Sequence, residues 1–173
     1  MTGPFGADDP AQPGTGRDLR WPAGLSPGFS DVWARSELVV LAAPAVVFAP
    51  LVAVSRWERD FAGIQNVRIP AVSGGYLEMD SEFEFELDGL GLCAQVTEFT
   101  PGSRLAWSGQ GIDITAYHGW VVSGHLGRSR VLAGFAARGA AAIALRETDL
   151  GAAQRTLDRW VADLRQAAEG AAP

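Results

Sequence analysis

The residue best suited to chemistry in this sequence is His118, which lies in the segment Tyr117–Trp120. An imidazole has an ordinary pKa of about 6.5, so it can accept or donate a proton near neutral pH. Strand alternation would place His118 on one face with Trp120 and Val122, and we expect this face to point inward. His118 is then either a ligand contact or general acid/base, or a core histidine hydrogen-bonded to the backbone.

Other reactive residue types give weaker signals. Tyr76 and Tyr117 could donate a hydrogen bond to a carbonyl, although Tyr117 should point away from the His118 face. Cys93 is the only cysteine, so no intramolecular disulfide can form, and we expect a packed, inert thiol. Two histidines and one cysteine match no usual zinc ligand set, and the sequence has no phosphate-loop, serine-hydrolase or zinc-protease motif. We therefore expect no metal and no cofactor.

Composition narrows the class of partner. The chain of 173 residues has 14 basic and 20 acidic side chains, a formal net charge of −6 and 47% hydrophobic residues. This balance lacks the basic footprint of a nucleic-acid-binding protein. The uncharged stretch 38–54 is shorter than the roughly 20 residues that span a membrane, and two prolines interrupt it. Because residues 1–20 lack the apolar segment of a signal peptide, we expect a cytoplasmic protein.

The chain divides into a tail and one domain. Residues 1–35 are rich in glycine and proline without a sustained period, which predicts a flexible tail before a domain at 36–170. Trp21, Phe29 and Trp33 are unusual in a solvated tail. Phe29 and Trp33 either dock on the surface of the domain or belong to a flap or partner-binding segment.

The elements that must position His118 follow from periodicity. Residues 76–88 alternate apolar and acidic side chains, which predicts a long strand with one wet face. Short glycine-containing links then separate segments typical of an antiparallel meander, at residues 92–99, 104–108, 112–123 and 129–135. Earlier segments predict a strand at 37–41, two short helices and an edge strand at 64–69. The C-terminal part is predicted to be an amphipathic helix from about residue 140, with a kink or restart allowed at 148–149. Its apolar face carries Leu150, Leu157, Trp160, Val161 and Leu164.

This order favours an α+β fold in which a curved antiparallel sheet wraps the terminal helix. The inward side chains expected from the sheet are mostly large: Met79, Phe83, Phe85, Trp107 and Trp120, with His118 and Ser81 among them. Residues 140–144 of the helix are small. They either interdigitate with the large residues and fill the core, or leave room for a ligand, and the polar His118 favours a pocket.

Four segments carry a resemblance to a known superfamily: Val40–Phe48, Ser55–Glu58, Val96–Trp107 and Tyr117–Trp120. In their order and spacing the chain resembles the START/Bet v 1-like (SRPBCC) superfamily, and within it the small bacterial polyketide cyclase/dehydrase-like proteins, over residues 36–169. The resemblance implies a helix-grip fold, with a seven-stranded antiparallel sheet around the long C-terminal helix, two short helices after the first strand and an elongated apolar cavity. A glutamate often found near the end of the last strand is missing from Gly134–Ala137.

The resemblance implies a hydrophobic, polyketide-like ligand in an internal cavity. Its expected lining residues are Trp57, Met79, Ser81, Phe83, Phe85, Trp107 and Trp120. With His118 as acid/base catalyst, the protein would cyclise, aromatise or dehydrate this ligand as a lyase or isomerase. The alternative is a non-catalytic lipid or isoprenoid carrier or sensor, and a third hypothesis is a partner-binding module acting through the aromatic tail. The sequence leaves a homodimer open.

Overall fold

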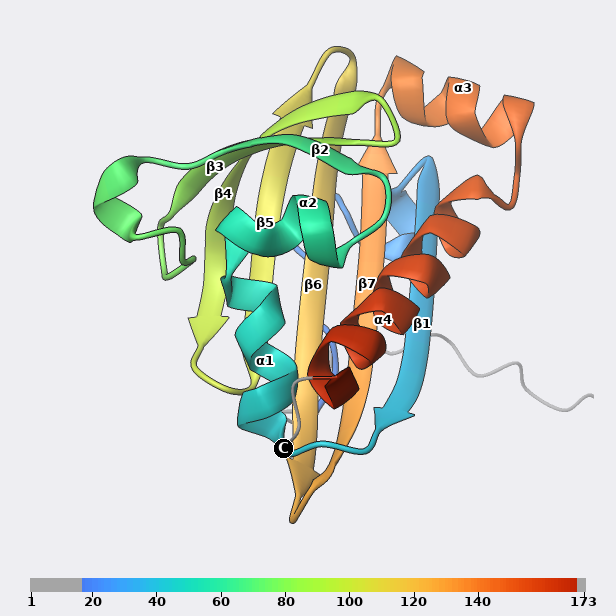
Figure 1. The fold of residues 1–173 in the computed structure, drawn as a ribbon. Helices are drawn as coiled ribbons and strands as arrows, with labels where there is room; N and C mark the ends of the chain where they lie inside the picture. The colour runs from blue at the N-terminus through green and yellow to red at the C-terminus, as the bar shows by residue number, and fades with distance from the viewer. Residues whose placement is uncertain (1–16, 171–173) are drawn as a thin grey trace, which may run out of the picture.

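The structure is a computed structural model that describes residues 17–170, so the first 16 residues of the expected tail lie outside it (Figure 1). Seven antiparallel strands form one strongly curved sheet in the order β1-β7-β6-β5-β4-β3-β2. The strands are β1 (Val32–Val40), β2 (Ile64–Arg68), β3 (Glu82–Leu87), β4 (Leu90–Thr100), β5 (Arg104–Gly111), β6 (Ile114–His125) and β7 (Arg128–Arg138). The α+β class and the seven-stranded sheet are as predicted.

The helices lie against the concave face of this sheet or at its ends (Figure 1). They are α1 (Pro44–Val52), α2 (Trp57–Asp60), α3 (Ala140–Thr148) and α4 (Ala152–Gly170), with short 3-10 turns at Pro27–Phe29, Val54–Arg56 and Ala71–Ser73. Pro44 begins α1, where a missing N–H costs nothing. The sheet therefore grips α4, with two short helices after the first strand as expected.

The C-terminal helix is broken where the sequence allowed a restart. Residues 149–151 separate α3 from α4, and the Asp149 side chain accepts a hydrogen bond from the Gly151 N–H at 3.2 Å. Leu150 was expected on the packed helical face, but it is 80% exposed because it lies in this break. The buried stripe of α4 is Leu157, Trp160, Val161 and Leu164.

The acidic alternating segment forms a shorter strand than its pattern predicts. β3 begins only at Glu82, because Asp80 adopts a left-handed backbone with φ 63° and the Ser81 hydroxyl accepts a hydrogen bond from the Glu78 N–H at 2.9 Å. Met79 and Ser81 therefore belong to a turn, and Met79 is 47% exposed. The prediction that these two residues point inward from a strand is wrong.

Residues 17–31 pack along the outer face of the sheet, where composition predicted a flexible tail. Leu19 and Leu25 are buried there, whereas Phe29 and Trp33 are 71% and 50% exposed. The strand β1 starts at Val32, so Trp33 is already part of the sheet. The side chains that dock are thus Leu19, Trp21 and Leu25, because they can bury apolar surface on the sheet.

Candidate functional site

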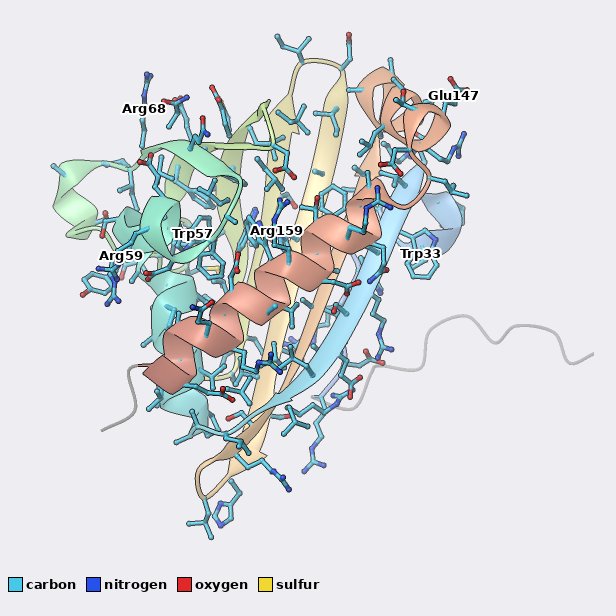
Figure 2. The ribbon with its side chains drawn as sticks, turned by 45° about the vertical axis from the view of Figure 1, so that its right-hand side comes forward. Trp33, Trp57, Arg59, Arg68, Glu147 and Arg159 are labelled. Atoms are coloured by element: carbon cyan, nitrogen blue, oxygen red, sulfur yellow. The ribbon has the colours of Figure 1, made fainter. Side chains whose placement is uncertain are left out.

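One cluster of rings fills the space between the sheet and α4. This ring cluster consists of Trp57, Phe61, Phe83, Phe85, Trp107, His118, Trp120 and Trp160. Figure 2 shows Trp57 between the sheet and the helices, with Trp33 far from it beside β1. The Trp57 ring centroid lies 5.2 Å from Trp107, 5.6 Å from Phe83 and 5.8 Å from Trp160. The tilted and edge-on contacts are those that aromatic rings favour.

His118 lies at the centre of this cluster. Its ring centroid is 4.8 Å from Trp107 on β5, 5.0 Å from Trp120 on β6 and 4.8 Å from Trp160 on α4. The residue is 5% exposed. The prediction that His118 points inward on the same face as Trp120 is therefore confirmed.

Burial changes the protonation state of His118. Removal from water disfavours the imidazolium and lowers the pKa of His118 from 6.5 to about 3. At neutral pH the ring is thus neutral, with one nitrogen that donates and one that accepts a hydrogen bond. In this closed arrangement His118 can hydrogen-bond or accept a proton, but it holds no proton to give as an imidazolium.

Three ring nitrogens of the cluster are buried without a hydrogen-bond partner among residues 17–170. They are His118 Nε2, Trp120 Nε1 and Trp160 Nε1. Their rings are neighbours, since Trp120 and Trp160 stack at 6.1 Å with an interplanar angle of 15°. By contrast, Trp57 Nε1 donates to the Leu51 carbonyl at 3.2 Å. A buried donor without a partner costs about 1–3 kcal/mol, so an oxygen atom brought to these nitrogens would be bound favourably.

The ring cluster is closed in this structure. Three surface grooves over the described part of the chain have volumes of about 810, 310 and 520 Å³; Phe83 lines the first and Phe85 the second, but none of the three is lined by His118, Trp107 or Trp120. The sheet was expected to face the small residues 140–144, but these form α3 at the end of the sheet (Figure 1). The large Trp160 of α4 faces the sheet instead and fills the space.

Most of the predicted site residues come together, with two exceptions and one omission. Trp57, Phe83, Phe85, Trp107, Trp120 and His118 share the ring cluster, whereas Met79 and Ser81 lie outside it. Trp160 completes the cluster but was recognised only as part of an amphipathic stripe, because periodicity does not reveal which strand a helix faces. Cys93 is exposed rather than packed, since it points outward from β4 beside Glu84.

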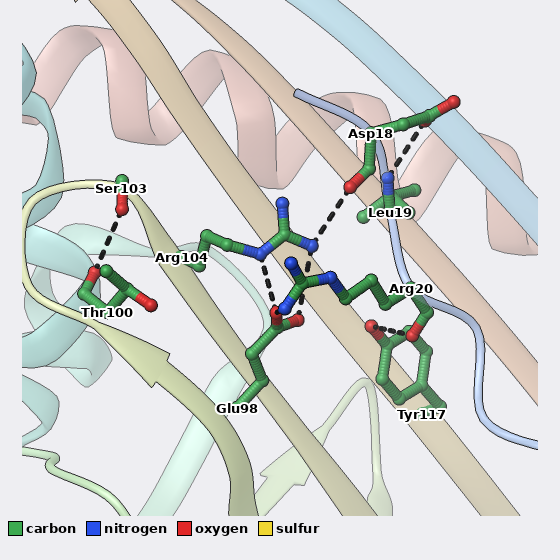
Figure 3. Close-up of polar contacts among 8 residues, drawn as sticks. All are labelled: Asp18, Leu19, Arg20, Glu98, Thr100, Ser103, Arg104 and Tyr117. Atoms are coloured by element: carbon green, nitrogen blue, oxygen red, sulfur yellow. Dashed lines mark hydrogen bonds and ion pairs between the residues drawn. The ribbon is translucent and has the colours of Figure 1, made fainter. Parts of the chain in front are cut away.

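A second polar cluster lies on the opposite, outer face of the sheet (Figure 3). The buried Arg104 guanidinium donates to Glu98 at 2.6 Å and to the Asp18 carbonyl at 2.9 Å. The Tyr117 hydroxyl donates to the Arg20 carbonyl at 3.0 Å. Burial and the nearby Glu98 carboxylate raise the pKa of Tyr117 above its ordinary value, so it remains a neutral donor. These contacts attach the N-terminal segment to the sheet.

Residues 17–170 contain neither a metal-ligand cluster nor a membrane-spanning helix. No group of three or more His, Cys, Asp or Glu side chains is placed to hold a metal ion there. No helix in that range is both long and apolar enough to cross a membrane. The cytoplasmic location and the homodimer remain predictions.

The curved sheet, its strand order and the gripped helix define an α+β helix-grip protein. No family model matches the sequence, and no curated protein matches it. Among solved structures, a hypothetical protein from Helicobacter pylori is similar with a TM-score of 0.80 and 25% identity, covering 90% of this chain and 98% of that one.

Two other solved structures carry informative names. The Zhui aromatase/cyclase from Streptomyces sp. R1128 has a TM-score of 0.63 and 13% identity over 80% of this chain and 93% of that one. A START superfamily protein from Mycobacterium smegmatis has a TM-score of 0.62 and 11% identity over 81% and 99%. The protein therefore shares its fold with a START superfamily protein and with an aromatase/cyclase, and the helix-grip fold that the resemblance implied is confirmed.

Proposed function

We propose that this protein binds a hydrophobic small molecule between the sheet and α4, and that the molecule carries an oxygen atom on an apolar, polyketide-like body. The observation that carries the proposal is the set of three unpartnered nitrogens, on His118, Trp120 and Trp160, inside an otherwise apolar ring cluster. Two indole N–H groups and a neutral imidazole suit a carbonyl or hydroxyl oxygen. The fold shared with an aromatase/cyclase supports the same class of ligand.

Binding must open the cluster, because its rings are in contact in the present structure. Trp160 is the member that α4 contributes, and it touches Trp57, Trp107, His118 and Trp120. We expect the Trp160 ring to turn aside when a ligand enters, with its N–H still directed into the opened space. The ligand then replaces ring contacts with its own apolar surface and places its oxygen against the indole N–H groups of Trp120 and Trp160, beside His118 Nε2.

The further step that we propose is cyclisation, aromatisation or dehydration of this ligand. His118 would remove a proton beside a carbonyl while the indole N–H groups stabilise the developing negative charge on the oxygen. The alternative is a non-catalytic carrier or sensor. The pKa of about 3 favours this alternative, because so weak a base gives little driving force for proton removal.

Binding is tested by NMR of the full-length, ¹⁵N-labelled protein with 1-tetralone, an apolar bicyclic ketone. The indole N–H signals are assigned through single Trp→Phe variants. We expect the signals of Trp120 and Trp160 to shift on titration, while that of Trp33, which is half exposed on β1, stays in place as the control. If Trp120 and Trp160 do not respond to 1-tetralone or to any other apolar ketone, the proposed site is wrong.

Catalysis is tested separately, after native mass spectrometry of the protein exposed to an extract of its source cells. A bound compound with the mass of a cyclised or dehydrated extract component would support turnover. With that compound's precursor as substrate, His118→Ala should abolish turnover and change affinity by no more than a few-fold. Binding without any turnover would support the carrier.

A further inference from the structure

The N-terminal segment 17–28, here named the strap, lies on the outer face of β5, β6 and β7 as a bound peptide would. Its apolar side chains enter two small outer clusters. Leu19 packs with Val121 and Leu132, and Leu25 packs with Ala106 and Tyr117. Trp21 contacts both clusters, and its ring centroid lies 5.6 Å from that of Tyr117. Three apolar side chains therefore account for the packing of the strap on the sheet.

Two glycines of the sheet, Gly119 and Gly134, leave space for the Trp21 ring. Gly119 and Gly134 are directly opposite each other on β6 and β7. A Cβ atom at Gly134 would lie 2.7 Å from the Trp21 ring and would also collide with Leu19. A Cβ atom at Gly119 would lie 2.9 Å from the ring of Tyr117, which extends beneath the indole. Two glycines in neighbouring central strands therefore make the close approach of the strap feasible.

The sheet also holds the strap through hydrogen bonds to its main chain, as a peptide-binding surface does. Four side chains of the sheet donate hydrogen bonds to strap carbonyl oxygens: Arg130 to Arg17 at 3.0 Å, Arg104 to Asp18 at 2.9 Å, Tyr117 to Arg20 at 3.0 Å and Arg138 to Gly24 at 3.4 Å. No main-chain hydrogen bond joins residues 17–28 to a strand in the described part of the chain. The strap is thus held by side chains and is not an eighth strand.

The link between strap and domain has no buried residue, and Gly28 and Phe29 in it are exposed. It consists of the short 3-10 turn Pro27–Phe29, which contains no buried residue, followed by Ser30 and Asp31. The first main-chain hydrogen bond to the sheet is donated by Asp31, to the Ala137 carbonyl at 3.0 Å. The structure therefore separates a docked peptide from the body of the domain at a short solvent-facing turn.

We propose that the outer face of β5–β7 is a peptide-binding surface and that the strap is a detachable intramolecular ligand for it. The surface fits an extended peptide with a tryptophan two residues after a leucine and a second leucine four residues further on. The surface packs against these three side chains and donates hydrogen bonds to the carbonyl oxygens of the peptide. This inference is independent of the proposed ligand site, because the strap and the ring cluster lie on opposite faces of the sheet.

The test keeps the full chain and makes the strap separable. A specific protease site is inserted between Gly28 and Phe29, and the purified, folded protein is then cleaved. We expect the cleaved protein to keep its circular dichroism spectrum and the fragment to remain bound. A fluorescein-labelled synthetic peptide of residues 17–28 should exchange into the surface, measured by anisotropy, and unlabelled peptide should displace it.

Specificity is measured with two variant peptides. Trp21→Ala should weaken binding at least tenfold, because it removes the side chain that fills the space over Gly119 and Gly134. Ala23→Ser, at an exposed position of the strap, is the matched control and should bind within about twofold of the natural peptide. Unfolding on cleavage, failure of the peptide to bind, or equal binding of the Trp21→Ala peptide would each overturn the proposal.

Discussion

The imidazole of His118, in the middle of β6, lies 4.8 Å from the indole of Trp160 on α4, measured between ring centroids. This contact joins the centre of the sheet to the helix that it grips. It also covers the titratable member of the ring cluster with a large apolar ring. The same pair therefore determines the packing of the core, the neutral state of His118 and the position of two unpartnered nitrogens.

Replacement of His118 by glutamine tests its role in packing. The variant loses contacts with three indole rings and buries an amide among them, so we expect about 2–4 kcal/mol of destabilisation at pH 7. Urea unfolding followed by circular dichroism measures it. His125→Gln makes the same change at the exposed end of β6, and we expect less than about 0.5 kcal/mol there. Equal costs would show that His118 is not packed as described.

The stability of the protein should depend on pH through His118. Its pKa is about 3 when folded and near the ordinary 6.5 when unfolded, so the unfolded state binds more protons between these values. Stability from this group is thus complete above pH 6.5 and is lost as the pH falls towards 3, by at most about 1.4 kcal/mol per pH unit. The His118→Gln variant does not lose stability in this way, because glutamine does not titrate. The stability gap between wild type and variant should therefore narrow from pH 7 to pH 4.5, and a constant gap would contradict the shift.

The buried guanidinium of Arg104 should matter more than the exposed one of Arg20, although both contact Glu98. The Arg104 side chain is 6% exposed and that of Arg20 is 63% exposed. Arg104→Met leaves the Asp18 carbonyl without this donor and Glu98 without its closest cation, and should cost about 2–4 kcal/mol. Arg20→Met should cost at most about 1 kcal/mol. Urea unfolding of both variants measures the two losses in unfolding free energy. A larger loss for Arg20→Met than for Arg104→Met would contradict the arrangement in Figure 3.

Gly63 provides space for an ion pair between the β3–β4 turn and α4. Arg159, labelled in Figure 2, donates to both Asp88 carboxylate oxygens at 2.9 and 2.8 Å. A Cβ atom at Gly63 would collide with the Asp88 carboxylate and lie 2.7 Å from Arg159 Nη2. Gly63→Ala should therefore destabilise the protein by about 2–3 kcal/mol.

Gly74→Ala is the matched control for this substitution. Gly74 also has a left-handed backbone, with φ 63° against 84° at Gly63, but a Cβ atom there would meet no atom within 4 Å. We expect a cost of about 1 kcal/mol from the backbone alone. Similar unfolding free energies for the two variants would mean that the Asp88–Arg159 pair moves aside freely.

Periodicity predicted the sheet correctly where a strand has one face in water. Phe83 and Phe85 point inward while Glu84 points outward, because a half-buried strand needs this alternation. The same pattern continued through Met79 and Ser81, where it failed. The Ser81 hydroxyl and the left-handed Asp80 form a local turn there, and such side-chain hydrogen bonds compete with strand pairing.

The amino-acid sequence by itself determined the α+β class, the meander of strands and the amphipathic stripe of the last helix. These depend on patterns within a few residues, which bias the backbone and select the buried face. It also identified His118 as an inward polar residue. Only the tertiary structure decided that Trp160 covers His118, that three ring nitrogens lose their partners and that Trp21 rests on Gly134. Burial, pKa and docking depend on contacts between distant parts of the chain, and no local pattern encodes them.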